Sequence, residues 1–442
     1  MKRFVYPAAS AAVLLSSVMA VNANAQGTHR GANAPTVVQL CSSGPVGVPA
    51  LRDLWKGAQQ GVSLAMFQWR PKLNKVGVRL GPQVALDDAK SDGSTYSPDV
   101  ERQNALTCTA NSHVMGYVGT LNSGAALVSE PVLNRAHLVQ ISPANTNPGL
   151  TSFSAYQGVG GRNSQEPATA HHQLKWVSYF RTVTTDALQG PAGAVFAKKY
   201  LGAKSVYVVD DKLTYGAGLA SSFKGQAQKL GMSVLGTGHI DSSSPAAEAQ
   251  TAQSLASTIS QKKPDLVYCG CDSETSASLP RDLRQAGFTK PYMGGDALVN
   301  TAYVKSAGPG AVNNYGTSVG PPPQLSSSTF RKLYKHYFPG FFKNPGPQAY
   351  DATAYDAASI ILKAIYQAAQ AHKLTGNARN MRTQVVHNVR FIKYCGATGC
   401  MKFDNNGDTT NRILSVYKVN TSKADWGFQR EVRAPAGLKP AP

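Results

Sequence analysis

The sequence lacks an apolar run long enough to cross a membrane. The apolar stretch from about Ala8 to Val21 is shorter than the roughly 20 residues that a spanning helix needs. Lys2 and Arg3 precede this stretch, and Ala23-Asn24-Ala25 follows it, which is the order of a secretory signal peptide. We therefore expect a signal peptide over residues 1–25, cleavage after Ala25, a periplasmic location and a mature chain that does not span the membrane.

Acidic residues are scarce, because 24 Asp and Glu stand against 44 Lys and Arg. Removal of Lys2 and Arg3 with the signal peptide changes the formal charge from +20 to +18 (20 − 2). The sequence has no block of about five or six basic residues, and an exported protein rarely meets nucleic acid. We interpret the charge as a solvated basic surface, which favours anionic partners, and expect no nucleic-acid partner.

Cysteine is also rare, with six residues at positions 41, 108, 269, 271, 395 and 400. In an oxidising compartment disulfides are the default, and Cys395 and Cys400, which bracket the turn-rich GATG, are the favoured pair. Cys269 and Cys271 have the spacing of a metal or redox pair. Alternate residues of a strand point to opposite faces, however, so we expect buried thiols or separate bridges there. No cysteine follows the apolar stretch before Cys41, which gives no support for a lipid anchor.

Apolar strand-like segments alternate with segments of helical spacing. The strand-like segments are TVVQL from Thr36, VMGYVGTL from Val114, HLVQI from His137, SVYVVDD from Ser205 and DLVYCGC from Asp265. The helical segments cover about 51–69, 98–111, 186–201, 216–230, 248–262 and 350–371. This alternation predicts an α/β fold with doubly wound parallel sheets, and the 417 residues left after cleavage (442 − 25) favour two lobes. In such sheets ligands bind outside the carboxyl ends of the strands.

The stretch ISPANTNPGLT, residues 141–151, has the composition of such a strand end. Its apolar residues give way to small hydroxyl, amide and proline residues, and it contains no Cys, His or acidic residue. A site built in this way holds a molecule rather than transforming it.

Motifs of enzymes are present only in incomplete form. Gly316–Gly320 matches G-x-S-x-G around Ser318, but three prolines follow where a helix would have to begin. Gly216-Ala217-Gly218 resembles the start of a dinucleotide fingerprint, with Ser221 in place of its third glycine. His171-His172, in a predicted loop over 153–176, has no acidic or thiol partner nearby. We expect no enzyme, no cofactor and no metal.

Five ordered motifs resemble those of periplasmic branched-chain amino-acid-binding proteins of the ABC transport family. They are VGTLNSGAA, ISPANTNPGLT, RTVTTDALQG, YGAGLASSF and PYMGGDALVN, and FDNNGD follows near the end. The resemblance covers about Val37 to Lys418. It implies a type I periplasmic binding protein fold, with two doubly wound lobes joined by three crossovers. It places the N-terminal lobe at 36–182 and 318–402, and the C-terminal lobe at 183–317 and 403–440.

The resemblance also implies a ligand site between the lobes. Ser123, Ala144 and Thr146 match positions that hold the α-carboxylate of the ligand, and hydroxyls and free amides at helix N-termini suit an anion. Asp296 matches the acid that pairs with the α-ammonium, and Tyr215 matches an aromatic residue of the cleft. The alternatives with a purely structural role are a helix cap for Asp296 and ordinary turns for Ser123 and Thr146.

Two positions depart from the leucine-binding members of the family. Asp272 stands where they have an aromatic residue, and a carboxylate facing the cleft suits a more polar or cationic ligand than leucine. Asn122 stands where they have a disulfide cysteine.

The expected function is that of a periplasmic receptor for an amino acid, branched-chain or related, that delivers its ligand to an inner-membrane ABC permease and acts as a monomer. The alternatives are a receptor or sensor for another small solute, such as an amide, a urea-like compound or an aromatic acid, and an exported hydrolase that would use Ser318 or His171-His172.

Overall fold

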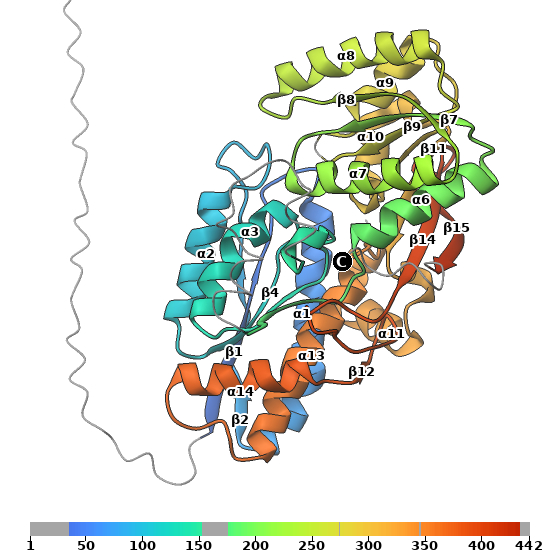
Figure 1. The fold of residues 1–442 in the computed structure, drawn as a ribbon. Helices are drawn as coiled ribbons and strands as arrows, with labels where there is room; N and C mark the ends of the chain where they lie inside the picture. The colour runs from blue at the N-terminus through green and yellow to red at the C-terminus, as the bar shows by residue number, and fades with distance from the viewer. Residues whose placement is uncertain (1–34, 153–175, 274, 344–345, 434–442) are drawn as a thin grey trace, which may run out of the picture. The chain divides into compact units, whose positions relative to one another are not determined.

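The computed structural model describes residues 35–152, 176–273, 275–343 and 346–433, whose strands form two large sheets (Figure 1). The predicted signal peptide and His171-His172 lie outside the described residues, as does nearly all of the predicted loop 153–176.

The first sheet is parallel, has the strand order β2-β1-β4-β5-β6, and pairs β3 with β1. Its strands are β1 (Thr36–Ser43), β2 (Val78–Leu80), β3 (Val84–Leu86), β4 (Val114–Val118), β5 (Gln140–Ser142) and β6 (Tyr179–Arg181). Its helices are α1 (Arg52–Asn74), α2 (Pro98–Ala110), α3 (Ser123–Arg135), α11 (Ser328–Tyr337), α12 (Pro339–Lys343), α13 (Asp351–Gln370) and α14 (Ala378–Arg390). Because successive strand residues point to opposite faces, Leu40 and Val118 pack with α1, α13 and α14, whereas Cys41 and Tyr117 pack with α2 and α3.

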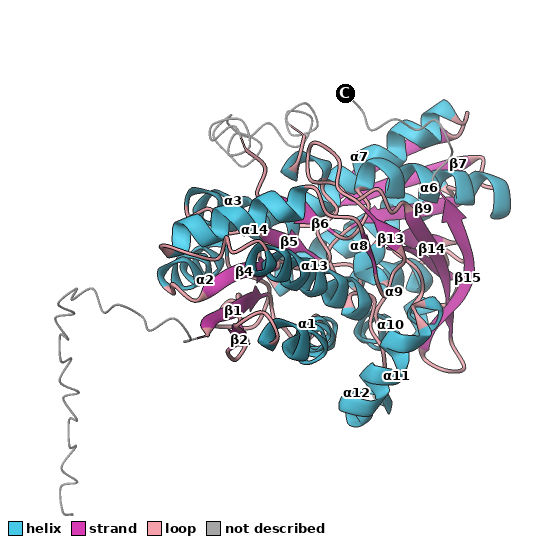
Figure 2. Ribbon diagram, turned by 90° about the horizontal axis from the view of Figure 1, so that it is seen from below, coloured by secondary structure: helices cyan, strands magenta, loops and turns pink. Residues whose placement is uncertain are grey.

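The second sheet has the order β15-β14-β11-β10-β9-β7-β8, and its neighbouring strands are parallel except at β11–β14 and β14–β15. Its strands are β7 (Ser205–Asp210), β8 (Ser233–His239), β9 (Leu266–Gly270), β10 (Tyr292–Gly294), β11 (Asn314–Val319), β14 (Ile413–Asn420) and β15 (Asp425–Arg433). Its helices are α6 (Asp186–Tyr200), α7 (Thr214–Lys229), α8 (Pro245–Lys262), α9 (Ser278–Gln285) and α10 (Thr301–Ala307). Tyr207 and Val267 pack with α8, α9 and α10, while Val206 and Tyr268 pack with α6 and α7. Figure 2 shows β14 and β15 at one edge of this sheet.

The chain passes between the two sheets three times: from β6 to α6, from β11 to α11, and from β13 (Cys400–Met401) to β14. A hairpin of β12 (Tyr394–Cys395) with β13 precedes the third passage. Single 3-10 turns are η1 (Pro148–Leu150), η2 (Asp296–Leu298), η3 (Gly308–Ala311) and η4 (Pro323–Leu325). The predicted α/β fold with two doubly wound, parallel-sheet lobes is confirmed, and the antiparallel strands β14 and β15 are an addition to it. The lobe boundaries stay a prediction.

Three disulfides connect the cysteines in the pairs Cys41–Cys108, Cys269–Cys271 and Cys395–Cys400. The third pair was predicted. The expectation that Cys269 and Cys271 would be thiols or form separate bridges was wrong. Cys271 lies beyond the last residue of β9, so the alternation of faces that separates neighbouring strand positions no longer applies to it.

The two enzyme-like motifs have structural explanations. Ser318 lies inside β11, opposite Ser415 of β14, and therefore not on a sharp turn between a strand and a helix. Gly216 lies in the first turn of α7, where a Cβ atom would collide with the carbonyl oxygen of Gly270. The glycine thus permits a close approach between helix α7 and strand β9.

Within the described ranges no helix is both long and apolar enough to cross a membrane. The same residues contain no group of three or more His, Cys, Asp or Glu side chains placed to hold a metal ion.

Candidate functional site

A pocket lies where strands of both sheets end at their carboxyl termini. Leu121 and Asn122 follow β4, and Asp272 follows β9. The full lining is Leu51, Leu54, Leu121, Asn122, Ser123, Ala144, Tyr215, Asp272, Ser273, Asp296, Ala297 and Tyr350. This is the position at which open α/β sheets bind ligands.

Asp296, two residues after β10, accepts hydrogen bonds from three side chains. Its Oδ1 accepts the Tyr215 hydroxyl at 2.8 Å and the amide of Gln189 at 2.9 Å, while its Oδ2 accepts the Tyr350 hydroxyl at 2.5 Å. The residue is only 2% exposed. Burial raises the pKa of Asp296 above its ordinary range, and the hydrogen bonds from Tyr350, Gln189 and Tyr215 oppose that rise.

Asp296 does not cap a helix. It is the first residue of the 3-10 turn η2, whose N-cap position is Gly295, and the N-cap of the following helix α10 is Asn300. Gly295 precedes it, and a Cβ atom at that position would collide with the Tyr215 hydroxyl. The glycine therefore allows the tyrosine to reach the carboxylate. The helix-cap interpretation of Asp296 is wrong, because its carboxylate binds side chains from other elements.

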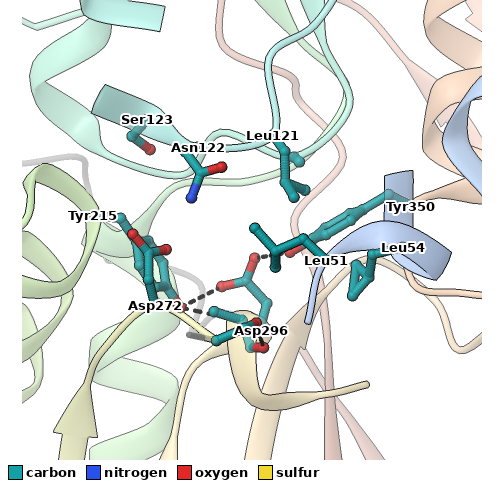
Figure 3. A pocket seen from close by; sticks show the side chains of 12 residues that line it. Leu51, Leu54, Leu121, Asn122, Ser123, Tyr215, Asp272, Asp296 and Tyr350 are labelled. Atoms are coloured by element: carbon teal, nitrogen blue, oxygen red, sulfur yellow. Dashed lines mark hydrogen bonds between the residues drawn. The ribbon is translucent and has the colours of Figure 1, made fainter. Parts of the chain in front are cut away.

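Asp272 lies on the same wall as Asp296 (Figure 3). Its backbone N–H donates to Asp211 Oδ2 at 2.7 Å, and the Thr275 hydroxyl donates to the same oxygen at 3.0 Å. Asp211 also accepts the N–H of Leu213 at 3.0 Å. Burial raises the pKa of Asp211 to about 6. Asp211 thus ties the loop that carries Asp272 to the start of α7.

The opposite wall consists of residues at the start of α3. Figure 3 shows Leu121, Asn122 and Ser123 on the side of the pocket that faces Asp272 and Asp296. Asn122 is the N-cap residue of α3, but its side chain makes no capping hydrogen bond. The first N–H groups of a helix have no partner within the helix, so this wall presents hydrogen-bond donors and the positive end of the helix dipole.

The predicted site stretch forms a loop that Arg181 holds from behind. The guanidinium, fully buried in β6, donates to the carbonyl oxygens of Asn145 and Asn147 at 3.2 and 2.8 Å, and to the Thr151 hydroxyl. Its Nε also donates to Asp408 at 2.6 Å, within FDNNGD. Arg181 therefore joins the loop to the third passage between the sheets.

The structure brings five of the six predicted site residues together in the pocket. They are Ser123, Ala144, Tyr215, Asp272 and Asp296. The sixth, Thr146, does not line the pocket. Its hydroxyl donates instead to Asp186 Oδ2 at 3.0 Å. The loop turns Thr146 toward the N-terminus of α6, so its contact with a ligand stays a prediction.

Leu51, Leu54 and Leu121 supply an apolar part of the lining. The space between the lining side chains is a cavity of ≈ 20 Å³, about the volume that one water molecule needs. A hydrogen bond joins Tyr350, which packs in the core of the first lobe, to Asp296 of the second. An amino acid can enter only if these walls separate.

Three contributors were not predicted as site residues. Tyr350 precedes α13, some 50 residues after Asp296, and a tyrosine at the start of an amphipathic helix carries no sign of a site. Gln189 lies inside α6 and resembles any polar helix residue. The sequence identified Asn122 only as the residue that stands in place of a cysteine. An Asn at an N-cap position with no capping bond is informative once its geometry is known.

The chain matches the family described as "Periplasmic binding protein" over residues 38–424. The Leu/Ile/Val-binding protein homolog 3 of Brucella melitensis is 25% identical over 369 residues, which are 83% of this chain and 86% of that protein. The crystal structure of a leucine-binding protein from Thermotoga maritima has a TM-score of 0.71 and 22% identity, covering 90% of this chain and 99% of that one. A solute-binding protein of R. palustris in complex with benzoate has a TM-score of 0.68 and 15% identity, covering 90% and 97%.

Proposed function

The chain belongs to the periplasmic binding protein family, and we propose that it is the solute receptor of an ABC importer, with an amino acid as its ligand. The observation that carries the choice of ligand is the buried carboxylate of Asp296, with donors arranged around it. An ammonium group is a natural partner for such a carboxylate, because it can replace a hydroxyl donor and neutralise the buried charge.

The two walls of the pocket suit the two charged groups of an amino acid. The α-ammonium binds Asp296, where it displaces the Tyr350 hydroxyl. The α-carboxylate binds the Ser123 hydroxyl and the N–H groups at the start of α3, which stabilise an anion without a cationic side chain. Ala144 contributes contact rather than an N–H group, because its N–H already donates to Ser142 Oγ at 3.1 Å.

Ligand entry and capture then follow from the connections between the lobes. The walls open to admit the amino acid and close on it, because the ligand joins groups from both lobes and favours the closed form. We retain the boundaries 36–182 with 318–402 and 183–317 with 403–440 for the two moving bodies.

The cellular setting completes the proposal. Residues 1–25 direct export and are removed, the mature chain acts as a monomer in the periplasm, and it delivers the ligand to an inner-membrane permease without transforming it. The basic surface of the chain meets anionic partners in that compartment.

Calorimetric titration of the mature chain with amino acids, amides and aromatic acids tests the proposal. At a hundred times the dissociation constant, a ligand that binds only the folded form adds about 2.7 kcal/mol to the free energy of unfolding, so thermal shifts identify candidates first. Asp296→Asn keeps an acceptor oxygen for one of the two tyrosine hydroxyls but removes the charge, and should weaken amino-acid binding by about 2–5 kcal/mol.

Asp356→Asn is the matched control. Asp356 is buried, accepts the N–H groups of Ala397 and Thr398 at 2.6 and 2.8 Å, and is not among the residues that line the pocket. This variant should lose stability and keep its affinity. The absence of binding to every amino acid, or equal affinity in Asp296→Asn and wild type, would refute the proposed ligand class.

A second candidate is a receptor for an aromatic acid, which the benzoate complex of the R. palustris protein favours. Such a ligand offers a carboxylate and no ammonium. It should bind the wild-type chain and the Asp296→Asn variant about equally, and the same titrations therefore separate the two candidates. An exported hydrolase has less support, because Ser318 lies within a strand.

A further inference from the structure

A second cavity lies beside the amino-acid pocket, between elements of the two lobes. Its volume is ≈ 390 Å³, within the range of about 300–1,000 Å³ in which proteins bind small molecules. One side includes residues of α11 and α12 and residues 346–349, and the other includes residues 299–301 and residues of β14 and β15. Phe342 packs against the core of the first lobe, and Trp426 packs against the core of the second. A molecule in this cavity would therefore contact both lobes.

The second cavity and the amino-acid pocket share a wall. Residues 346–349 line the cavity, and the next residue, Tyr350, lines the pocket. From the other lobe, residues 299–301 line the cavity, whereas Asp296 and Ala297 line the pocket. The Tyr350 hydroxyl donates to Asp296 Oδ2 where these two segments meet. A movement of either segment therefore changes both the cavity and the pocket.

The lining of the cavity offers flat apolar surface. Three aromatic side chains contribute to it, those of Phe342, Tyr417 and Trp426. The Trp426 indole is fixed, because its Nε1–H donates to the carbonyl oxygen of Asn300 at 2.9 Å and its ring stacks on Tyr303 with the centroids 5.7 Å apart. The polar group of this indole is thus satisfied, and its ring is left for apolar contact. Rings of this kind bind other rings through offset-stacked or edge-to-face contacts.

Arg331 supplies the positive charge of this lining. Its Nη1 donates to the carbonyl oxygens of Gln324, at 2.7 Å, and Ser326, while its Nε and Nη2 donate to no group within the described residues. A guanidinium with donors left over binds a carboxylate through two parallel hydrogen bonds. Asp425, the acidic residue of the lining, is exposed to water, and its Oδ1 accepts the N–H of Trp426 at 2.7 Å. Because water solvates Asp425, the half-buried Arg331 determines the charge of a ligand that fits here.

We propose that the cavity is a second binding site, for a small molecule that joins an aromatic ring to a carboxylate, and that its occupation weakens binding in the amino-acid pocket. The carboxylate binds Arg331, and the ring contacts Phe342, Tyr417 and Trp426. The existence of this site is independent of the proposed function, whereas its effect on the pocket rests on that function.

The sign of the coupling follows from the arrangement of the lobes that forms the cavity. A ligand that contacts Arg331 and Trp426 joins the two lobes and favours the arrangement in which both residues line the cavity. In that arrangement the Tyr350 hydroxyl stays on Asp296, and the pocket has a volume of only ≈ 20 Å³. An amino acid displaces this hydroxyl, so the two ligands favour different arrangements. By linkage, each ligand lowers the affinity of the other by the same factor.

Phenylpropionate and phenylpropionamide form a matched pair of probes for the second site. The two molecules have the same ring and chain, and they differ in the negative charge. Calorimetric titration of the wild-type chain should give the acid an affinity about tenfold or more above that of the amide, because a hydrogen bond between two charged groups is stronger than one with a neutral partner.

Substitutions at the lining locate the bound probe. Arg331→Met should remove the preference for the acid. Lys332→Met is the matched control, because it removes the same charge from the next residue of α11, which does not line the cavity, and it should keep the preference. Phe342→Ala should weaken the binding of both probes and leave their ratio unchanged. The thermal midpoint of each variant without ligand reports whether it folds, and the comparison of acid with amide gives a result on the wild-type chain alone.

Tyr350→Phe tests the coupling without a second ligand. Tyr350 does not line the cavity, but the loss of its hydroxyl removes a hydrogen bond that holds the shared wall. The variant should therefore bind phenylpropionate about fivefold or more weakly than the wild-type chain does.

A direct test titrates leucine, threonine and glutamate with and without saturating phenylpropionate. An amino acid that binds should lose affinity by about fivefold or more when phenylpropionate is present, and this loss should vanish in Arg331→Met.

The outcomes separate the second site from the proposed function. Equal affinity for acid and amide, or acid binding that neither Arg331→Met nor Phe342→Ala changes, would overturn the second site and leave the amino-acid receptor standing. If phenylpropionate binds through Arg331 but neither Tyr350→Phe nor the amino-acid titration shows an effect, the coupling is overturned. If no amino acid binds, the proposed function fails, and the comparison of acid with amide still decides the second site.

Discussion

Replacement of Arg181 by methionine tests how the site loop is held in place. The substitution keeps an unbranched apolar stem and removes a guanidinium that bonds to Asn145, Asn147, Thr151 and Asp408. The ion pair with Asp408 breaks, and two backbone carbonyl oxygens lose a charged donor. The loop between β5 and η1 then has no common anchor to the third passage.

The size of the expected stability loss follows from the burial of Arg181 and Asp408. Removal of one member of a buried ion pair costs about 3–5 kcal/mol. Arg181 is fully buried, whereas the side chain of Asp408 is 20% exposed, so water can partly solvate the acid that remains. The Thr151 hydroxyl also donates to Asp408, at 3.0 Å to Oδ1. We therefore expect a loss near the lower end, about 3 kcal/mol.

Urea unfolding, followed by circular dichroism and by tryptophan fluorescence, measures this loss if the two probes give one transition. Arg382→Met is the matched control, because Arg382 is also buried, at 4% exposed, but donates to the backbone carbonyls of Val114, Thr109 and Asn111. Arg382→Met should lower the free energy of unfolding by less than Arg181→Met and leave ligand affinity unchanged. Arg181→Met should also weaken ligand binding. Equal losses in the two variants, with affinity preserved in both, would refute the role given to the ion pair.

Three further predictions concern stability and the pocket. Burial raises the pKa of Glu101 to about 7 and of Asp351 to about 8, so between about pH 5 and 8 the folded chain binds protons that the unfolded chain does not. The free energy of unfolding should therefore be a few kcal/mol higher at pH 5.5 than at pH 8.5, and lower stability at the acidic value would contradict this sign. Replacing both Cys41 and Cys108 by alanine should lower the free energy of unfolding by about 4 kcal/mol, because their bridge closes a loop of 67 residues; a loss below about 1 kcal/mol in urea would contradict it. Gly295→Ala should push the Tyr215 hydroxyl off Asp296 and weaken amino-acid binding at least tenfold in calorimetry, and unchanged affinity would show that this contact is dispensable.

The fold could be predicted because its signals are local. The helical spacing of 51–69 and the alternation of apolar strands with such helices correspond to α1 and to the two sheets. The spacing Cys395-x4-Cys400 identified a bridge that closes its own turn. The pair Cys269–Cys271 was mispredicted, because the strand pattern DLVYCGC does not reveal that β9 ends at Gly270.

The site could be predicted only where a residue belongs to a recognisable motif. Ser123, Ala144 and Asp296 follow strands in segments that resemble known ones, and the structure places all three in the pocket. Tyr350 and Gln189 reach Asp296 through tertiary packing, because α13 and α6 happen to present them there. Such contacts depend on how the lobes assemble, and no periodicity in the sequence encodes them.

The hydrogen bond between Tyr350 and Asp296 limits which solutes can bind to the Asp296 carboxylate. Any solute that binds this carboxylate must interact with it more favourably than the Tyr350 hydroxyl, whose oxygen lies 2.5 Å from Asp296 Oδ2. Water and neutral alcohols offer about the same kind of hydrogen bond and gain nothing by the exchange. A cation gains the attraction between opposite charges in a site with little solvent, where that attraction is strong. In the proposed receptor, Tyr350 therefore competes with uncharged solutes for the carboxylate of Asp296, and the remaining contacts of the pocket discriminate among the charged ones.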